Sequence, residues 1–370
     1  MVLPNLAVKI AELNLENPII VASGPLTSDL ESIVRVAGYQ PGAVVTKTIA
    51  IREAAPPSPN IYRLRDGSLL NCEEWSEKSL SYWVKCIQKL RSLELSGVKI
   101  IASIVSLSGE VWEIEKILRE LSMAKPDAVE VTCLYDPSKL AEHVKAAVSA
   151  IDVPVLAKIS IPFLNDQYVI EVCERIINSG ARAVVVGDTY GPCLHVDIET
   201  CKPVLGSKNG SGRISGPAIR PFTIYYTSLL ARKGIPVISC GGIERWEDVV
   251  EALMSGALAV EVLTALILKG ADRIIELKNK VQSYLSKAGY EDIGEIVGKA
   301  NYEIEQRIKG EVPHGKWKPT IDAALCTKCG LCSKLCPYHA IKVLETPIID
   351  EERCGKCGLC LSICPAKAIR

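Results

Sequence analysis

Residues 326–341 read CTKCGLCSKLCPYHAI, and residues 354–369 read CGKCGLCLSICPAKAI. The two segments share ten of sixteen positions at an offset of 28 residues, so they form an internal repeat. Each has the pattern C-x2-C-x2-C-x3-C-P, which is typical of bacterial ferredoxins that hold two [4Fe–4S] clusters. The repeat therefore predicts a ferredoxin-like domain with two [4Fe–4S] clusters at residues 321–370.

The eight cysteines of the repeat divide into two predicted ligand sets. Three closely spaced cysteines reach one cluster from a tight loop, and the fourth, which precedes a proline, binds the other cluster. The first set is Cys326, Cys329, Cys332 and Cys364, and the second is Cys354, Cys357, Cys360 and Cys336. A pair of zinc knuckles is the alternative, but zinc sites typically use two pairs of ligands separated by a longer spacer. The spacing favours iron–sulfur clusters, and hence one-electron transfer.

Upstream of the repeat, short apolar runs alternate with segments of helical periodicity. Each run is almost continuously apolar, as expected for a strand buried on both faces. There are eight such runs: Pro18–Ala22, Ala43–Thr48, Lys99–Val105, Ala128–Cys133, Pro154–Ser160, Ala183–Thr189, Pro236–Cys240 and Ala259–Leu263. Eight β/α units in about 250 residues match a (β/α)8 TIM barrel, with a doubly wound open sheet as the alternative. We therefore predict an α/β barrel over residues 1–290 and a connector over 291–320. Residues 6–15 are expected to form a hairpin that plugs the bottom of the barrel.

The composition excludes several classes of protein. The 370 residues include 43 basic and 43 acidic side chains, which argues against a nucleic-acid-binding protein. The start, MVLPNLAVKI, lacks the features of a signal peptide, and no apolar run reaches the ~18 residues of a membrane helix. Fifteen cysteines without a secretory signal favour metal ligands or reactive thiols over disulfides. We expect a cytoplasmic protein that binds neither nucleic acid nor membrane.

Several short segments at the predicted strand ends carry a family resemblance. They are NPIIVASG at 17–24, TKT at 46–48, LNCEEWSEK at 70–78, SGPAIRP at 215–221 and TAL at 264–266. Together with the C-terminal repeat they resemble the dihydroorotate and dihydropyrimidine dehydrogenase family. TIM-barrel active sites form at this end of the strands. The resemblance implies an FMN-dependent iron–sulfur oxidoreductase acting on a CH–CH bond of a small cyclic substrate, of dihydropyrimidine or dihydroorotate type.

The resemblance also assigns residues to the FMN. Lys158 matches a family lysine that tunes the flavin potential, and Lys47 matches a second flavin-contacting lysine. The phosphate is expected at backbone N–H groups of the loops after the later strands. The expected cofactor-binding residues are Ala22, Ser23, Gly24, Lys47, Thr48, Glu73, Lys158, Ser215, Gly216, Gly241, Gly242, Leu263 and Thr264. Taken singly, a strand-end lysine could be a structural ion pair and a glycine pair could be a tight turn, so it is the whole set in barrel order that favours FMN.

The substrate side departs from the family pattern. The family has an Asn-x-Ser-Cys-Pro-type loop after the fourth strand, whose cysteine is the acid/base, but residues 130–137 here read EVTCLYDP. Ungapped alignment puts Tyr135 at the position of the catalytic cysteine, two residues after Cys133. The predicted catalytic residues are Cys133, Tyr135 and Lys47, with Asp136 as a further candidate for proton transfer. The predicted substrate-binding residues are Asn71, Thr132, Asp188 and Thr189.

Among the departures from the family pattern, Asp188 changes the expected substrate most. The family has an Asn-Thr pair where this chain has Asp188-Thr189, and an ionised carboxylate accepts hydrogen bonds but donates none. This change predicts a substrate with more hydrogen-bond donors, or a positive charge, and it leaves both dihydroorotate and uracil in question. The alternative function is a flavin/iron–sulfur electron-transfer subunit without its own pyrimidine chemistry. The altered loop favours that alternative, and the retained Asn71 speaks against it.

The electron partner is expected to be another protein. No G-x-G-x-x-G follows a predicted strand, so we expect no nicotinamide site in this chain. An FAD- and NAD(P)-binding reductase subunit or a soluble ferredoxin is the expected partner. The family resemblance further implies a homodimer or a hetero-oligomer.

Overall fold

The computed structural model describes the chain except for residues 1–2, 94, 134–135, 161–164, 312–316 and 344–346. The chain divides into two compact units, residues 1–302 and residues 303–370. Within the described residues, none of the helices combines the length and apolar character that crossing a membrane requires.

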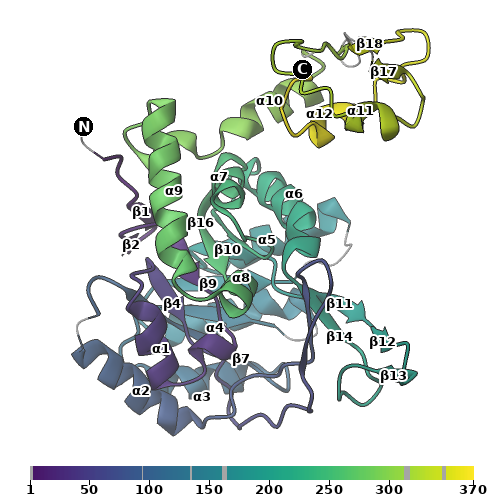
Figure 1. The fold of residues 1–370 in the computed structure, drawn as a ribbon. Helices are drawn as coiled ribbons and strands as arrows, with labels where there is room; N and C mark the ends of the chain where they lie inside the picture. The colour runs from purple at the N-terminus through teal and green to yellow at the C-terminus, as the bar shows by residue number, and fades with distance from the viewer. Residues whose placement is uncertain (1–2, 94, 134–135, 161–164, 312–316, 344–346) are drawn as a thin grey trace. The chain divides into compact units, whose positions relative to one another are not determined.

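Eight parallel strands close the barrel of the first unit (Figure 1). They are β3 (Ile19–Val21), β4 (Ala43–Val45), β7 (Lys99–Val105), β8 (Ala128–Thr132), β9 (Val155–Ile159), β10 (Ala183–Val186), β15 (Val237–Cys240) and β16 (Ala257–Val262). Their order around the barrel is β10-β15-β16-β3-β4-β7-β8-β9, and each coincides with a predicted apolar run. The predicted TIM barrel is therefore confirmed, and the open-sheet alternative is wrong because β10 pairs with both β9 and β15.

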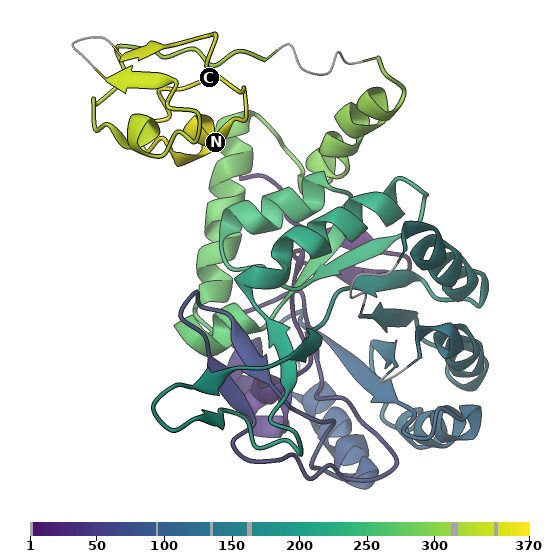
Figure 2. The ribbon, with the colours of Figure 1, turned by 90° about the vertical axis from the view of Figure 1, so that its right-hand side faces the viewer.

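Helices surround the strands, as Figure 2 shows. They are α1 (Leu30–Ala37), α2 (Leu80–Ser92), α3 (Val111–Leu121), α4 (Leu140–Ala150), α5 (Asp166–Asn178), α6 (Arg220–Ala231), α7 (Trp246–Met254), α8 (Thr264–Lys269) and α9 (Arg273–Ala288). Local signals set their ends: the side chain of Asn165 accepts the N–H groups of Gln167 and Tyr168 at the start of α5, and Gly289, with φ of 78°, ends α9. Their apolar faces bury the outer surface of the barrel.

A hairpin precedes the first barrel strand, as predicted. It consists of β1 (Val8–Ile10) and β2 (Leu13–Leu15), which pair antiparallel. Ile10, Leu13 and Leu15 are buried in one cluster with inward-facing barrel residues. The hairpin thus packs against the barrel interior at the end where the strands begin.

A second, antiparallel sheet was not predicted. Its strands are β5 (Ile61–Arg63), β6 (Leu69–Asn71), β11 (Tyr190–Cys193) and β14 (Gly212–Ser215), in the order β11-β14-β6-β5. They come from the long connections after β4 and β10, and β12 (Val196–Asp197) and β13 (Lys202–Pro203) extend the second connection. We call the four-stranded sheet the cap sheet. It contributes the polar ends of β6 and β14 to the site described below.

The second unit shows the internal repeat as two similar halves. Its elements are α11 (Leu331–Lys334), β17 (Ile341–Val343), β18 (Pro347–Ile349) and α12 (Leu359–Ile363), while α10 (Lys299–Ile308) spans the division between the units. Gly330 and Gly358 precede the two short helices with φ of 76° and 78°, in the left-handed region that favours glycine. This equivalence supports the reading of the repeat as one structural unit used twice.

Candidate active site

A cavity lies where the carboxyl ends of the barrel strands meet the cap sheet. Asp136, the further candidate for proton transfer, does not line the cavity. The lining includes the other predicted site residues of the barrel that the structure describes: Ala22, Ser23, Gly24, Lys47, Thr48, Asn71, Glu73, Thr132, Cys133, Lys158, Asp188, Thr189, Ser215, Gly216, Gly241, Gly242, Leu263 and Thr264. Tyr135 falls outside the described residues. The structure therefore brings together, at one end of the barrel, residues that are almost 250 positions apart in the chain.

Two buried carboxylates and one buried lysine form part of the cavity wall. Lys158 extends from β9 between Glu130 on β8 and Glu261 on β16. Its Nζ lies 2.6 Å from Oε2 of Glu261 and 3.3 Å from Oε2 of Glu130. Both carboxylates are at most 1% exposed. The predicted Lys158 thus sits in a triad with two acids that sequence reasoning did not assign to the site.

The triad contains two carboxyl groups and one amino group. Burial, and then the nearby Glu261 carboxylate, raise the pKa of Glu130 to about 8. Burial acts to lower the pKa of Lys158, but Cys240, Glu130 and Glu261 outweigh it and raise that pKa well above the ordinary value. Oε1 of Glu261 is buried and has no hydrogen-bond partner among the described residues. At neutral pH Lys158 therefore stays charged and Glu130 retains its proton.

A second ion pair lies where β4 ends and the cap sheet begins. Lys47 donates to Oε2 of Glu73, and both residues were predicted at the cofactor. Asn60 donates to the other oxygen of Glu73 at 2.6 Å, so the carboxylate is held from two sides. The backbone N–H of Lys47 donates to the carbonyl of Thr27 at 2.8 Å. These bonds fix the position of an ammonium group that is about one-tenth exposed to the cavity.

Glycines and hydroxyls form a narrow loop cluster at the ends of β14, β15 and β16. Gly216, Gly241 and Gly242 all have positive φ, at 90°, 119° and 80°. A Cβ on Gly242 would lie 2.6 Å from Cα and 2.8 Å from N of Arg220, so only glycine fits there. Thr264 donates to Oγ of Ser215 at 2.9 Å and ties two of the loops together. Closely spaced backbone N–H groups of this kind suit an anion such as a phosphate.

The substrate-side residues line the part of the cavity next to the cap sheet. Asn71 donates to the carbonyl of Arg213 at 3.4 Å, and the two residues pair across β6 and β14. The thiol of Cys133 donates to the carbonyl of Asp136 at 2.9 Å. Arg213 binds Thr189 and was not predicted from the sequence, because an arginine next to a turn is usually a surface residue. Glu130 and Glu261 could have been found, since each is the one charge in an apolar strand.

The second unit contains two small cavities, each lined by four cysteines. Cys326, Cys329, Cys332 and Cys364 line one of them. Cys354, Cys357, Cys360 and Cys336 line the other. These are the two ligand sets that the crossed pattern of ferredoxins predicts. Among the described residues, no group of three or more His, Cys, Asp or Glu is spaced to hold a single metal ion.

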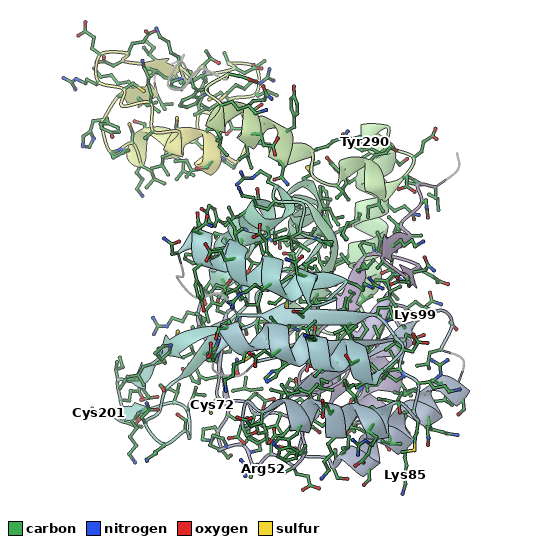
Figure 3. The ribbon with its side chains drawn as sticks, turned by 180° about the vertical axis from the view of Figure 1, so that it is seen from behind. Arg52, Cys72, Lys85, Lys99, Cys201 and Tyr290 are labelled. Carbon is green, nitrogen blue, oxygen red and sulfur yellow. The ribbon has the colours of Figure 1, made fainter. Side chains whose placement is uncertain are left out.

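The remaining cysteines divide by their environment. Burial raises the pKa of Cys86 and of Cys173 to about 12, which makes them packing thiols. Cys201 is exposed between β12 and β13 (Figure 3). The ring of His195 stacks on Tyr62 at 5.2 Å.

Comparison with known proteins agrees with this geometry. A family model described as dihydroorotate dehydrogenase matches residues 5–285, and one described as a 4Fe-4S dicluster domain matches residues 325–368. The chain is similar to proteins named dihydroorotate dehydrogenase B (NAD(+)), catalytic subunit. The one from Methanosarcina acetivorans is 34% identical over 305 residues, covering 77% of this chain and 93% of the relative. The one from Caldicellulosiruptor bescii is 29% identical over 308 residues, covering 80% and 99%. The chain therefore belongs to the dihydroorotate dehydrogenase family, oxidoreductases that act on CH–CH donors, and it carries a 4Fe-4S dicluster domain.

Proposed function

We propose that the chain binds FMN in the barrel cavity and two [4Fe–4S] clusters in the C-terminal unit, and that it oxidises or reduces a CH–CH bond of a dihydropyrimidine or dihydroorotate-type ring. The observation that carries the proposal is the meeting of three features in one cavity: the Lys158 triad, the glycine loop cluster and Asn71. The family relation narrows the reaction class, and the cavity supplies groups suited to it.

The cavity residues fit FMN. The loops at Gly216 and at Gly241-Gly242 leave room that a Cβ would fill, and they would hold the phosphate through backbone N–H groups. Lys158 would face the pyrimidine edge of the flavin, and Lys47 a second edge. When bound, FMN supplies an acceptor for a hydride and passes electrons on singly. A fixed positive charge at Lys158 stabilises negative charge on a neighbouring group, and the protein holds that charge in place with two carboxylates.

The protein's own groups would orient the substrate and move its proton. Asn71 and Thr189 present donors and acceptors, and Asp188 presents acceptors only. Cys133 and Tyr135 are our candidates for the acid/base. The thiol of Cys133 faces the cavity but donates to the carbonyl of Asp136, so it would have to turn from that bond to serve the substrate.

The two cysteine cavities would each hold one [4Fe–4S] cluster. Four thiolates per cavity match the ligand count of a cubane cluster. Since the relatives are named as catalytic subunits of NAD(+)-linked enzymes, we propose that a separate FAD- and NAD(P)-binding reductase subunit exchanges electrons with this chain, with a soluble ferredoxin as the other candidate. We also propose a cytoplasmic location and a homodimeric or hetero-oligomeric assembly.

An anaerobic flavin assay tests the proposal. Protein loaded with FMN and clusters is mixed separately with dihydroorotate, dihydrouracil and dihydrothymine while flavin absorbance is recorded. Bleaching by any of them supports the proposal. A flavin that dithionite reduces but none of the three bleaches would overturn the pyrimidine assignment. That outcome would favour the electron-transfer subunit, the candidate suggested by the altered loop at residues 130–137.

A further inference from the structure

The two halves of the cysteine repeat differ in size at two positions. Tyr338 follows the last cysteine and proline of the first half, and the equivalent residue of the second half is Ala366. The loop of the second half contains Gly355 where the loop of the first half has Thr327. One position is therefore larger in the first half, and the other is smaller in the second half.

These two positions meet in the structure. A Cβ on Gly355 would lie 2.5 Å from Cε2 and 2.8 Å from Cε1 of Tyr338, so the aromatic ring occupies the place where a side chain would begin. Gly355 is not among the glycines with positive φ, and its backbone conformation therefore does not itself require glycine. The space taken by the Tyr338 ring explains the glycine instead.

Tyr338 covers a loop that carries cysteine ligands. Gly355 directly follows Cys354 of the second ligand set, and Tyr338 lines the cavity of that set. Among the described residues, the lining of the first cavity contains no aromatic side chain, and Thr327 and Ala366 stand at the equivalent positions. Only the second set therefore has an aromatic ring over its ligand loop.

The hydrogen bonds to the crossing cysteines are matched between the two cavities. The N–H of Ala340 donates to Sγ of Cys336 at 3.4 Å, and the N–H of Ala368 donates to Sγ of Cys364 at 3.3 Å. Hydrogen bonds to sulfur and exposure to solvent both set the potential of an iron–sulfur cluster. These two bonds do not distinguish the cavities, whereas the aromatic cover does.

We propose that Tyr338 makes the two clusters unequal, because it covers the loop at Gly355 and keeps water from the cluster of the second set, which therefore accepts an electron less readily than the cluster of the first set. Reduction of either cluster adds one electron and breaks no bond. Water near the cluster stabilises the added negative charge, and a drier surrounding disfavours it. An electron that enters the unit then rests on the first cluster. This inference rests on the proposed binding of two [4Fe–4S] clusters.

A purely structural role does not account for Tyr338. The residue is 48% exposed, whereas its neighbours Ala340 and Ile341 are buried and supply the core of the unit. Ala366 shows that the same fold forms with only a methyl group at this position. What the ring adds is cover over a ligand loop, which an alanine does not provide.

An EPR-monitored redox titration of the full chain, loaded with FMN and clusters, tests the proposal. Dithionite supplies the electrons, and the signals of the reduced clusters are followed against the potential. We expect two one-electron steps whose equilibrium constants differ by at least about 10-fold, which corresponds to about 59 mV. Tyr338→Ala should raise the equilibrium constant of the lower step about 10-fold and leave the upper step unchanged. Repulsion between two reduced clusters also separates the steps, but it is the same in both proteins.

The reciprocal exchange and a matched control make the test sharper. Thr327→Gly combined with Ala366→Tyr places the same pair over the first set, and it should lower the equilibrium constant of the upper step about 10-fold. Gly355→Ala puts a methyl group where the ring lies and should raise the lower step, so it serves if Tyr338→Ala folds poorly. Ile348→Ala removes an exposed side chain of the same unit that lines neither cavity, and it should shift neither step. Iron content establishes that each variant holds its clusters.

Pulsed EPR in D2O measures the access of water directly. Deuterium modulation of the signal from the second cluster should increase in Tyr338→Ala and stay unchanged in Ile348→Ala. A residue that acted only on the fold would not change this modulation selectively at one cluster.

The outcomes separate this inference from the proposed function. If the iron is present but Tyr338→Ala leaves the lower step in place, or raises the upper step instead, the role of Tyr338 is overturned and the clusters stand. Unchanged deuterium modulation overturns the role as well. If the chain assembles no iron–sulfur cluster, the proposed clusters fail and this inference fails with them.

Discussion

Lys158 Nζ lies 2.6 Å from one oxygen of Glu261, and the other oxygen of Glu261 is buried without a hydrogen-bond partner among the described residues. Glu130 approaches the same ammonium at 3.3 Å. One buried cation therefore faces two buried acids, and ionising both would leave a net negative charge in a dry interior, which is unfavourable. A proton on Glu130 removes that charge.

Stability should consequently fall as the pH rises through the neutral range. The pKa of Glu130 is raised from 4.5 to about 8 by folding, so the folded state holds its proton more tightly than the unfolded state. This contribution is fully present below pH 4.5 and is lost as the pH approaches 8. Glu261→Gln leaves one acid with one base and should flatten the decline. We expect the melting temperature of the wild type to drop about 2–4 °C more than that of Glu261→Gln between pH 6 and pH 8.

A surface pair supplies the control for this experiment. Glu303→Gln breaks an exposed pair with Arg307 on α10 and should follow the wild-type pH dependence. Calorimetry on FMN-free protein keeps flavin binding out of the comparison. Identical slopes for the wild type and Glu261→Gln would show that the triad does not retain a proton.

A methyl group at Gly242 should weaken cofactor binding. Its Cβ would lie 2.6 Å from Cα and 2.8 Å from N of Arg220, and a backbone cannot move aside as a side chain can. We expect Gly242→Ala to destabilise the barrel by about 1–3 kcal/mol and to lower FMN affinity by at least about 10-fold. Urea unfolding and FMN fluorescence titration measure the two effects.

Gly234→Ala is the matched control for Gly242→Ala. Gly234 has almost the same φ, 76° against 80°, but nothing lies within 4 Å of the position of its Cβ. It should show the backbone cost alone, about 1–2 kcal/mol, with unchanged FMN affinity. Equal losses of FMN affinity in the two variants would mean that the loop at Gly242 does not hold the cofactor.

The barrel was predictable because its strands are buried on both faces. A run such as Val184–Val186 has no polar position, so it suits a central strand of a parallel sheet, which is covered on both faces. The cap sheet was missed for the opposite reason. β11 contains Gly191 and Pro192, and β14 pairs with β6 some 140 residues away, so neither local pattern nor proximity in the chain indicates the pairing.

Site residues that belong to family motifs could be predicted from the sequence. Site residues whose importance comes from their buried neighbours could not. Gly241 and Lys158 occur in family motifs, and the structure places both in the cavity. Glu261 and Arg213 belong to no motif used for the prediction. Their importance depends on neighbours from other strands, namely Lys158 for Glu261 and Thr189 for Arg213, and sequence spacing does not reveal such contacts. Tyr135 lies outside the described residues and stays a prediction.

Paired cysteine variants should reveal how the two proposed clusters share their ligands. Cys364 lines the cavity of the first repeat and Cys336 that of the second, so the ligand sets cross between repeats. With crossed ligands, Cys326→Ser combined with Cys364→Ser damages one cluster only, and about half of the iron should remain. Cys326→Ser combined with Cys336→Ser damages both clusters, and nearly all of the iron should be lost. If each repeat instead held its own cluster, the two results would be exchanged. Iron analysis and EPR spectroscopy of the reduced protein measure the cluster content of both double variants. The control is Cys201→Ser, which removes an exposed thiol of the barrel unit and should keep its full iron content.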